Sequence, residues 1–202
     1  MSDQIGLFDD GAIHGPGLEI EVHRNVLSVH AASDAFATLM KEVNWRQDHI
    51  SMFGKKAPLP RLTAWFGDPG FAYTYSGIEM MPKPWTPTLE FLKNMCEKAA
   101  LHRFNSALAN LYRTGSDGVA WHSDNEPELG RTPVIASLSL GGTRKFQLRR
   151  LDNTLIKREI VLFSGDLIIM SGTTQQLWVH QVPKTKAHVE PRINLTFREI
   201  IQ

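Results

Sequence analysis

Seven short β-type segments fill the chain from Asn105 to its end, and turn residues rather than helical segments separate them. Many short strands without intervening helices indicate antiparallel pairing. We therefore expect a double-sheet jelly roll or a barrel in this half of the chain. The segments are residues 107–113, 134–142, 145–151, 158–163, 166–172, 176–182 and 192–200.

Two amphipathic helices are expected before these strands. Ser33 is a plausible N-cap for the first helix, whose apolar residues follow at helical spacing: Phe36, Leu39, Met40 and Val43. The second helix is expected over Thr86–Ala100, with Thr86 as cap and Pro87 at the first helical position. We expect both helices to cover one face of the larger sheet, which gives a mainly β fold with flanking helices.

The composition fits one compact domain. The chain has 202 residues, of which 42% are hydrophobic, and one cysteine, so an intrachain disulfide is impossible. No apolar stretch reaches membrane-helix length, and the first 17 residues lack signal-peptide character. We expect a cytoplasmic monomer with no membrane contact, in which residues 1–17 form a mobile N-terminal arm and residues 18–202 form a single domain.

Basic residues occur in local clusters although the net charge is only +1, which argues against a basic surface overall. Such clusters either contact phosphates or lie in solvated loops, and both alternatives stay open. The clusters are Lys55, Lys56 and Arg61; Arg144, Lys145, Arg149 and Arg150; and Lys184 and Lys186.

A candidate metal site begins with His122 and Asp124, which project to the same side if they lie in a strand. A His-x-Asp pair alone is weak evidence, so a third ligand is needed. His180 lies in a later apolar segment and offers an imidazole. Two histidines and a carboxylate form the ligand set of non-haem iron(II) oxygenases. The alternative is a core histidine satisfied by hydrogen bonds.

The last strand alternates strictly between polar and apolar residues. Its polar positions are Arg192, Asn194, Thr196 and Arg198. If the strand is central, the two guanidiniums are buried and call for an anion, which a dicarboxylate such as 2-oxoglutarate would provide. Asn110 and Tyr112 show the same alternation and offer further hydrogen bonds. The alternative is an exposed strand with a solvated polar face.

Together these motifs resemble the signature of the AlkB family of DNA and RNA dealkylases, over roughly residues 40–200. The resemblance implies a double-stranded β-helix with Fe(II) on His122, Asp124 and His180. It also implies that Arg192 binds the distal carboxylate of 2-oxoglutarate. The rest of that pocket would come from Asn110, Tyr112, Asn194, Thr196 and Arg198.

The resemblance also implies the reaction. The family uses O2 and 2-oxoglutarate to hydroxylate the carbon attached to a base nitrogen, which releases formaldehyde, succinate and CO2. Lesions such as 1-methyladenine and 3-methylcytosine are the expected substrate class.

Resemblance further suggests residues that bind the substrate. Residues 71–77 are similar to the family's nucleotide-recognition lid. The domain is then expected to consist of two parts, the helices and lid at about 18–104 and the jelly-roll core at 105–202. Residues 51–56 resemble the finger hairpin of the branch that prefers double-stranded DNA. The tyrosines could equally belong to a core strand, and Phe53 could pack inward. The implied residues are Phe53, Gly54, Arg61, Tyr73, Tyr75, Ser76, Asn125 and Glu126.

The N-terminal segment resembles a short peptide by which bacterial replication and repair proteins bind the DNA sliding clamp. Its residues are Gln4, Leu7 and Phe8. The alternative is that the two apolar residues pack onto the domain.

Three other functions stay open at this level. The same oxygenase chemistry could act on RNA, protein or a small molecule, since a fold does not fix function. A non-catalytic nucleic-acid-binding module is a second possibility, but it would not explain why the chain has a complete set of metal ligands together with the two arginines. A zinc hydrolase could use His122, Asp124 and His180, but it would not need Arg192 and Arg198.

Overall fold

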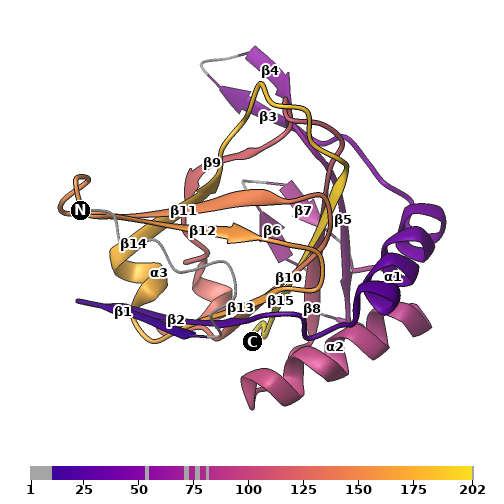
Figure 1. Ribbon diagram of the computed structural model, residues 1–202, viewed down its shortest axis with the longest axis horizontal. Coiled ribbons are helices and arrows are strands. Elements are labelled where there is room, and N and C mark those ends of the chain that lie inside the picture. Colours follow the sequence, from indigo (N-terminus) through magenta and orange to yellow (C-terminus); the bar gives the residue numbers. More distant parts are fainter. Residues whose placement is uncertain (1–10, 53–54, 71–72, 76–77, 81, 202) are drawn as a thin grey trace.

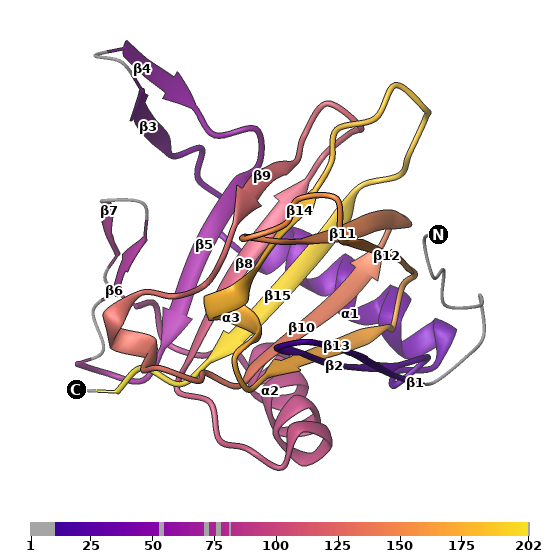
Figure 2. The ribbon, with the colours of Figure 1, turned by 90° about the vertical axis from the view of Figure 1, so that its left-hand side faces the viewer.

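Two antiparallel sheets face each other in the computed structural model, and this arrangement confirms the predicted jelly roll (Figures 1 and 2). Two helices cover the outer face of the larger sheet, as predicted. The structure describes residues 11–52, 55–70, 73–75, 78–80 and 82–201, and of these only the backbone at 50–52, 55–56, 73–75 and 78–80.

The larger sheet has the strand order β1-β2-β13-β10-β15-β8-β5. Its strands are β1 (Gly11–Gly15), β2 (Leu18–His23), β13 (Leu167–Ser171), β10 (Ile135–Gly141), β15 (Arg192–Arg198), β8 (Ser106–Tyr112) and β5 (Leu62–Gly67). The smaller sheet contains β12 (Lys157–Leu162), β11 (Arg144–Arg150), β14 (Trp178–Val182) and β9 (Val119–His122), in that order. Two separate hairpins pair β3 (His49–Met52) with β4 (Lys55–Pro58) and β6 (Tyr73–Tyr75) with β7 (Ile78–Met80).

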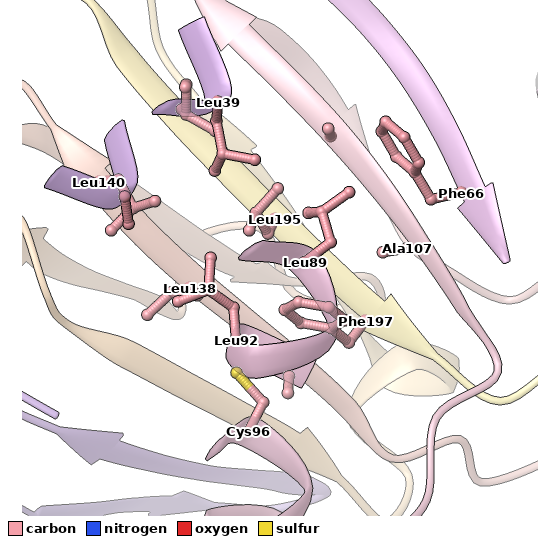
Figure 3. Close-up of a cluster of buried hydrophobic side chains, with 14 of the residues drawn as sticks. Leu39, Phe66, Leu89, Leu92, Cys96, Ala107, Leu138, Leu140, Leu195 and Phe197 are labelled. Carbon is pink, nitrogen blue, oxygen red and sulfur yellow. The ribbon is translucent and has the colours of Figure 1, made fainter. Parts of the chain in front are cut away.

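Successive residues of β15 face opposite sides of the larger sheet. Ile193, Leu195 and Phe197 pack into the core between this sheet and the two long helices, and Figure 3 shows Leu195 and Phe197 in that core. A second apolar core lies between the two sheets and takes residues from both. The polar residues of β15 line a pocket together with side chains of the smaller sheet. The period of two in the sequence therefore separates a helix-facing side from a pocket-facing side.

Helix α1 (Val29–Glu42) begins earlier than predicted. The N-cap is Ser28, whose side chain accepts a hydrogen bond from the backbone N–H of Ala31, so Ser33 lies inside the helix and the predicted cap is wrong. Leu39 and Val43 are buried as expected, but Met40 is exposed.

Helix α2 (Pro87–Ala100) agrees with the prediction. Thr86 caps it by accepting from the backbone N–H of Leu89, and Leu89, Leu92 and Cys96 are fully buried. Figure 3 shows these three side chains in the same core as Leu138 and Leu195 of the larger sheet. None of the helices in the described ranges is long and apolar enough to cross a membrane.

All seven predicted strand segments of the second half form strands. Two short helical turns, which were not predicted, lie among them: η1 (Pro127–Leu129) and α3 (Thr174–Leu177). Each turn joins strands of different sheets and is too short to show helical periodicity in the sequence.

The first part of the chain contributes more to the sheet than predicted. Residues 11–15 form β1, which pairs with β2 over five residues, so the expected mobile arm is wrong from residue 11 onward. Strands β1, β2 and β5 all join the larger sheet, so the jelly roll is not confined to residues 105–202. Residues 1–10 lie outside the described residues.

Candidate active site

Three side chains with metal-binding atoms meet between the two sheets. His122 at the end of β9 lies directly opposite His180 of β14 in the antiparallel register, and their ring centroids are 4.3 Å apart. Asp124 follows two residues beyond β9, and the ligand atoms of all three residues lie within 4.8 Å of one another. The cross-strand pairing explains why residues nearly 60 positions apart in the sequence form one cluster.

A hydrogen bond orients the imidazole of His122, and burial affects that of His180. His122 Nδ1 is 2.8 Å from the carbonyl oxygen of Ala120. A carbonyl can only accept, so in the neutral imidazole it is Nδ1 that carries the proton and Nε2 that keeps the lone pair. Burial lowers the pKa of His180 to about 3, and the neighbouring His122 adds to this lowering. His180 is therefore available as a neutral ligand near neutral pH.

The Asp124 carboxylate is buried with one oxygen paired and one unpaired. Its Oδ2 accepts a hydrogen bond of 2.9 Å from Arg198 Nη2, whereas Oδ1 has no hydrogen-bond partner among the described residues. Burial alone would raise the pKa of Asp124, but Arg198, His180 and His122 hold it below its ordinary value. An ionised carboxylate with one unpaired oxygen next to two imidazoles fits a divalent metal ion.

The polar face of β15 brings the predicted cosubstrate residues into the same pocket. Arg192 pairs in register with Tyr112 of β8, and Asn194 pairs with Asn110. All nine residues predicted for metal and cosubstrate line this pocket: Asn110, Tyr112, His122, Asp124, His180, Arg192, Asn194, Thr196 and Arg198.

Arg192 is a buried cation with unused donors. It is 1% exposed, and its Nη2 donates to Ser139 Oγ at 2.8 Å, but Nε and Nη1 have no acceptor in the described part of the chain. Burial lowers the pKa of Arg192 to about 10, and nearby Arg144 contributes to the lowering. A buried guanidinium with two free donors fits a carboxylate group.

Two arginines flank the ring of Tyr112. The guanidinium carbons of Arg144 and Arg192 lie 5.5 and 5.4 Å from the ring centroid. Arg144 also donates to the carbonyl oxygens of Asp117 and Pro183 at 2.8 and 2.7 Å. Arg144 thus joins two loops behind Tyr112 and holds the ring at the wall of the pocket.

Hydrogen bonds also orient the amides of the pocket. Asn194 Nδ2 donates to Ser137 Oγ at 2.8 Å, and Asn194 Oδ1 accepts from Thr196 Oγ1 at 3.2 Å. Arg61 Nε donates to Asn110 Oδ1 at 2.8 Å. Because the Asn110 oxygen is occupied, its amide nitrogen is the group left to donate to a ligand.

Arg61 and Arg144 do not belong to an exposed basic surface. They are 3% and 4% exposed, so the alternative that they contact phosphates is wrong for both. Within the same clusters, Lys145 pairs with Glu159 at 2.7 Å and Arg150 pairs with Asp152. Arg61 instead lines the pocket.

The other predicted substrate residues are placed only in part. Asn125 is exposed and Glu126 is half-buried, directly after Asp124. Tyr73 and Tyr75 lie on β6, of which only the backbone is described. The predicted residues Gln4, Leu7, Phe8, Phe53, Gly54 and Ser76 lie outside the described residues.

Sequence reasoning missed several residues that support the site. Ser137 and Ser139 alternate with Ala136, Leu138 and Leu140 in β10, so the same period of two could have indicated them. Gln175 hydrogen-bonds the backbone of Asp124 from α3, and no sequence pattern indicates it.

The buried pair of Arg198 and Asp124 gives a stability prediction. Arg198→Met keeps most of the side-chain volume but leaves the Asp124 carboxylate without its guanidinium. We expect the free energy of unfolding in the presence of a chelator to fall by about 3–5 kcal/mol. Adding Asp124→Leu should recover much of the loss, because the buried carboxylate that had lost its partner is then removed as well. Urea unfolding measures both effects, and an unchanged midpoint for Arg198→Met would contradict the pairing.

Comparison with known proteins identifies the family. The model of the 2OG-Fe(II) oxygenase superfamily matches residues 19–198. Alpha-ketoglutarate-dependent dioxygenase alkB homolog 3 of Bos taurus is 48% identical over 178 residues, which cover 84% of this chain and 62% of that protein. DNA oxidative demethylase ALKBH2 of Bos taurus is 35% identical over 201 residues, which cover 95% of this chain and 72% of that protein.

A solved structure supports the fold. The structure of OsALKBH1 has a TM-score of 0.65 at 19% identity and covers 93% of this chain and 100% of its own. The chain spans 62% of the length of the alkB homolog 3 relative. The chain belongs to the 2OG-Fe(II) oxygenase superfamily and, within it, to the AlkB family.

Proposed function

We propose that this protein removes N-methyl groups from nucleic-acid bases by oxidation, with Fe(II), O2 and 2-oxoglutarate. The observation that carries the proposal is one pocket that holds both the His122, Asp124 and His180 cluster and the unpaired donors of Arg192. A zinc hydrolase or a binding module would have no use for that combination. Membership of the AlkB family and the demethylase name of one relative support it.

In this proposal the three clustered side chains bind the metal. His122 Nε2, His180 and the unpaired Oδ1 of Asp124 would hold Fe(II), and a set of only three protein ligands would leave the ion accessible to cosubstrate and oxygen. When bound, iron supplies the activation of O2 that couples decarboxylation of 2-oxoglutarate to hydroxylation of the methyl carbon. Arg198 would keep the Asp124 carboxylate ionised and oriented.

The polar face of β15 would bind 2-oxoglutarate. Arg192 offers Nε and Nη1 to the distal carboxylate, while Tyr112 closes that end of the pocket. Arg198, Asn194 and Asn110 would contact the other end. Thr196 would orient Asn194 through its hydroxyl group.

The substrate class follows from what the hydroxylation produces. A hydroxylated N-methyl group is a hemiaminal, and its C–N bond breaks to release formaldehyde and restore the base nitrogen. Bases such as 1-methyladenine and 3-methylcytosine fit this chemistry. Tyr73, Tyr75 and Ser76 of the proposed lid would hold a flipped base, with Arg61, Asn125 and Glu126 on its other side.

Demethylation of an oligonucleotide tests the proposal. The protein is loaded with Fe(II) and 2-oxoglutarate without oxygen, then mixed with air and DNA that contains 1-methyladenine or 3-methylcytosine. We expect loss of methyl and formation of succinate, both reduced on the order of a hundredfold in His122→Ala because a metal ligand is lost. The control His188→Ala changes an exposed histidine on the β14–β15 loop and should keep full activity.

The outcomes separate the alternatives. Succinate without methyl loss would retain the oxygenase chemistry and reject methylated DNA as substrate, and methylated RNA and peptides would then be compared. If neither product forms, the enzymatic proposal is contradicted and a non-catalytic binding module is favoured.

We further propose that the substrate is double-stranded DNA. The backbone of β3 and β4 forms the expected hairpin, and Figure 2 shows it projecting from the body on the same side as the β6–β7 hairpin. In the sequence, Phe53 and Gly54 come between these two strands, and in this proposal Phe53 would wedge between base pairs while Lys55 and Lys56 would contact phosphate. The Lys184 and Lys186 cluster on the β14–β15 loop would add contacts to the backbone.

Phe53→Ala tests this preference. We expect repair of a duplex to fall roughly ten- to a hundredfold, because the wedge offsets an unstacking cost of a few kcal/mol, while repair of the matching single strand changes little. Leu155→Ala removes an exposed apolar residue from another turn and serves as the control. Equal losses on both substrates, or none on the duplex, would contradict the wedge.

We also propose that Gln4, Leu7 and Phe8 bind the DNA sliding clamp. The support is the resemblance of this segment to clamp-binding peptides. Deletion of residues 2–8 should abolish binding to the purified clamp and leave demethylation of short oligonucleotides unchanged. Clamp binding that survives the deletion would reject this partner.

A further inference from the structure

A buried glutamine outside the pocket hydrogen-bonds the backbone of one of the three clustered side chains, His122, Asp124 and His180. Gln175 lies on α3, between β13 and the strand that carries His180, and is 1% exposed. Glutamine is mostly exposed in folded proteins, so a fully buried one needs partners for its amide. Its Oε1 accepts a hydrogen bond of 3.0 Å from the backbone N–H of Asp124, and its Nε2 is 3.4 Å from the sulfur of Met170.

The position of Asp124 in the chain explains why this bond matters. Strand β9 ends at His122, whose backbone pairs with His180, so the sheet ladder holds the first ligand. Asp124 lies two residues beyond the ladder, where a buried N–H needs another acceptor. The Gln175 side chain provides that acceptor. The backbone of the carboxylate ligand is thus joined to the segment that leads into His180.

The amide of Gln175 has a defined orientation. The backbone N–H of Asp124 can only donate, so the amide oxygen must face it. The amide nitrogen then faces the thioether of Met170, which is a weak acceptor. An apolar residue of similar size would fill the same space but leave the Asp124 N–H without an acceptor.

The neighbouring glutamine provides a comparison. Gln176 is exposed and donates to the carbonyl oxygen of Arg131, at the far end of the loop that begins at Asp124. Gln176 therefore lies on the same helix and contacts the same loop as Gln175, but it does not hydrogen-bond the backbone of a proposed ligand.

We propose that Gln175 is a positioning residue that holds Asp124 against His122 and His180 and thereby sets the affinity for the metal ion. This inference rests on the proposed role of Asp124 as a ligand. Gln175 does not line the pocket. It acts through the backbone of Asp124, while Arg198 orients the carboxylate from the other side. Partners of this kind typically change metal affinity 10- to 100-fold.

Titration of the metal-free chain with Co(II) tests the proposal through the visible absorption of the bound ion. Gln175→Met removes the acceptor at similar size, and we expect its dissociation constant for Co(II) to rise about 10- to 100-fold with an altered spectrum. Gln175→Glu keeps an oxygen at the same position and should restore most of the affinity. Gln176→Ala is the matched control and should bind Co(II) like the wild type.

Thermal unfolding of each metal-free variant separates positioning from folding. Wild-type affinity in Gln175→Met would overturn the proposal. So would a lower unfolding temperature with unchanged affinity of the folded fraction, or a Gln175→Glu variant as weak as Gln175→Met. Failure of the wild type itself to bind Co(II) would reject the ligand assignment first, and this inference with it.

Discussion

Burial of two guanidinium groups on one face of a central strand is the constraint on which the site depends. Strand β15 lies between β10 and β8, so both of its edges are paired and neither face reaches bulk water. Its apolar residues pack against the helices, which forces Arg192 and Arg198 toward the smaller sheet. Charges in that position are tolerated only with partners. Asp124 is the partner of Arg198, and Arg192 retains donors for an anion.

Charge balance explains why metal and dicarboxylate belong together. Three arginines and one aspartate line the pocket: Arg61, Arg192, Arg198 and Asp124. A divalent cation alone would add to this positive excess, and a dicarboxylate alone would offset it. The two together leave the net charge unchanged, so each ligand reduces the electrostatic cost of burying the other. The proposed cosubstrate and metal are therefore mutually supportive on electrostatic grounds.

The elements that could be predicted are those whose side chains repeat with the period of the backbone. The alternation in β15 indicated both the apolar core face and the pocket face, and the Thr86 cap with Pro87 gave the start of α2. The predicted start of α1 was wrong because the capping bond is made by Ser28 and not by Ser33, five residues later. Strand β1 was missed because its residues carry little β-type pattern.

Residues whose role depends on distant contacts could not be predicted in the same way. Arg61 was grouped with neighbouring lysines, yet its bond to Asn110 exists only because β5 pairs with β8. Gln175 sits in a single helical turn, and its partner is 51 residues earlier in the sequence. Such residues meet only in the folded chain, and the spacing of residues along the local sequence does not indicate these contacts.

The central claim is that Arg192 binds the distal carboxylate of 2-oxoglutarate in this pocket. Anaerobic calorimetry of the Fe(II)-loaded protein tests it by comparing 2-oxoglutarate with 2-oxobutyrate, which lacks that carboxylate. Arg192→Met should weaken the binding of 2-oxoglutarate by about 2–5 kcal/mol, which is the usual cost of removing one partner of a buried charge pair. The binding of 2-oxobutyrate should stay nearly unchanged. Equal binding of 2-oxoglutarate to wild type and variant would contradict the account.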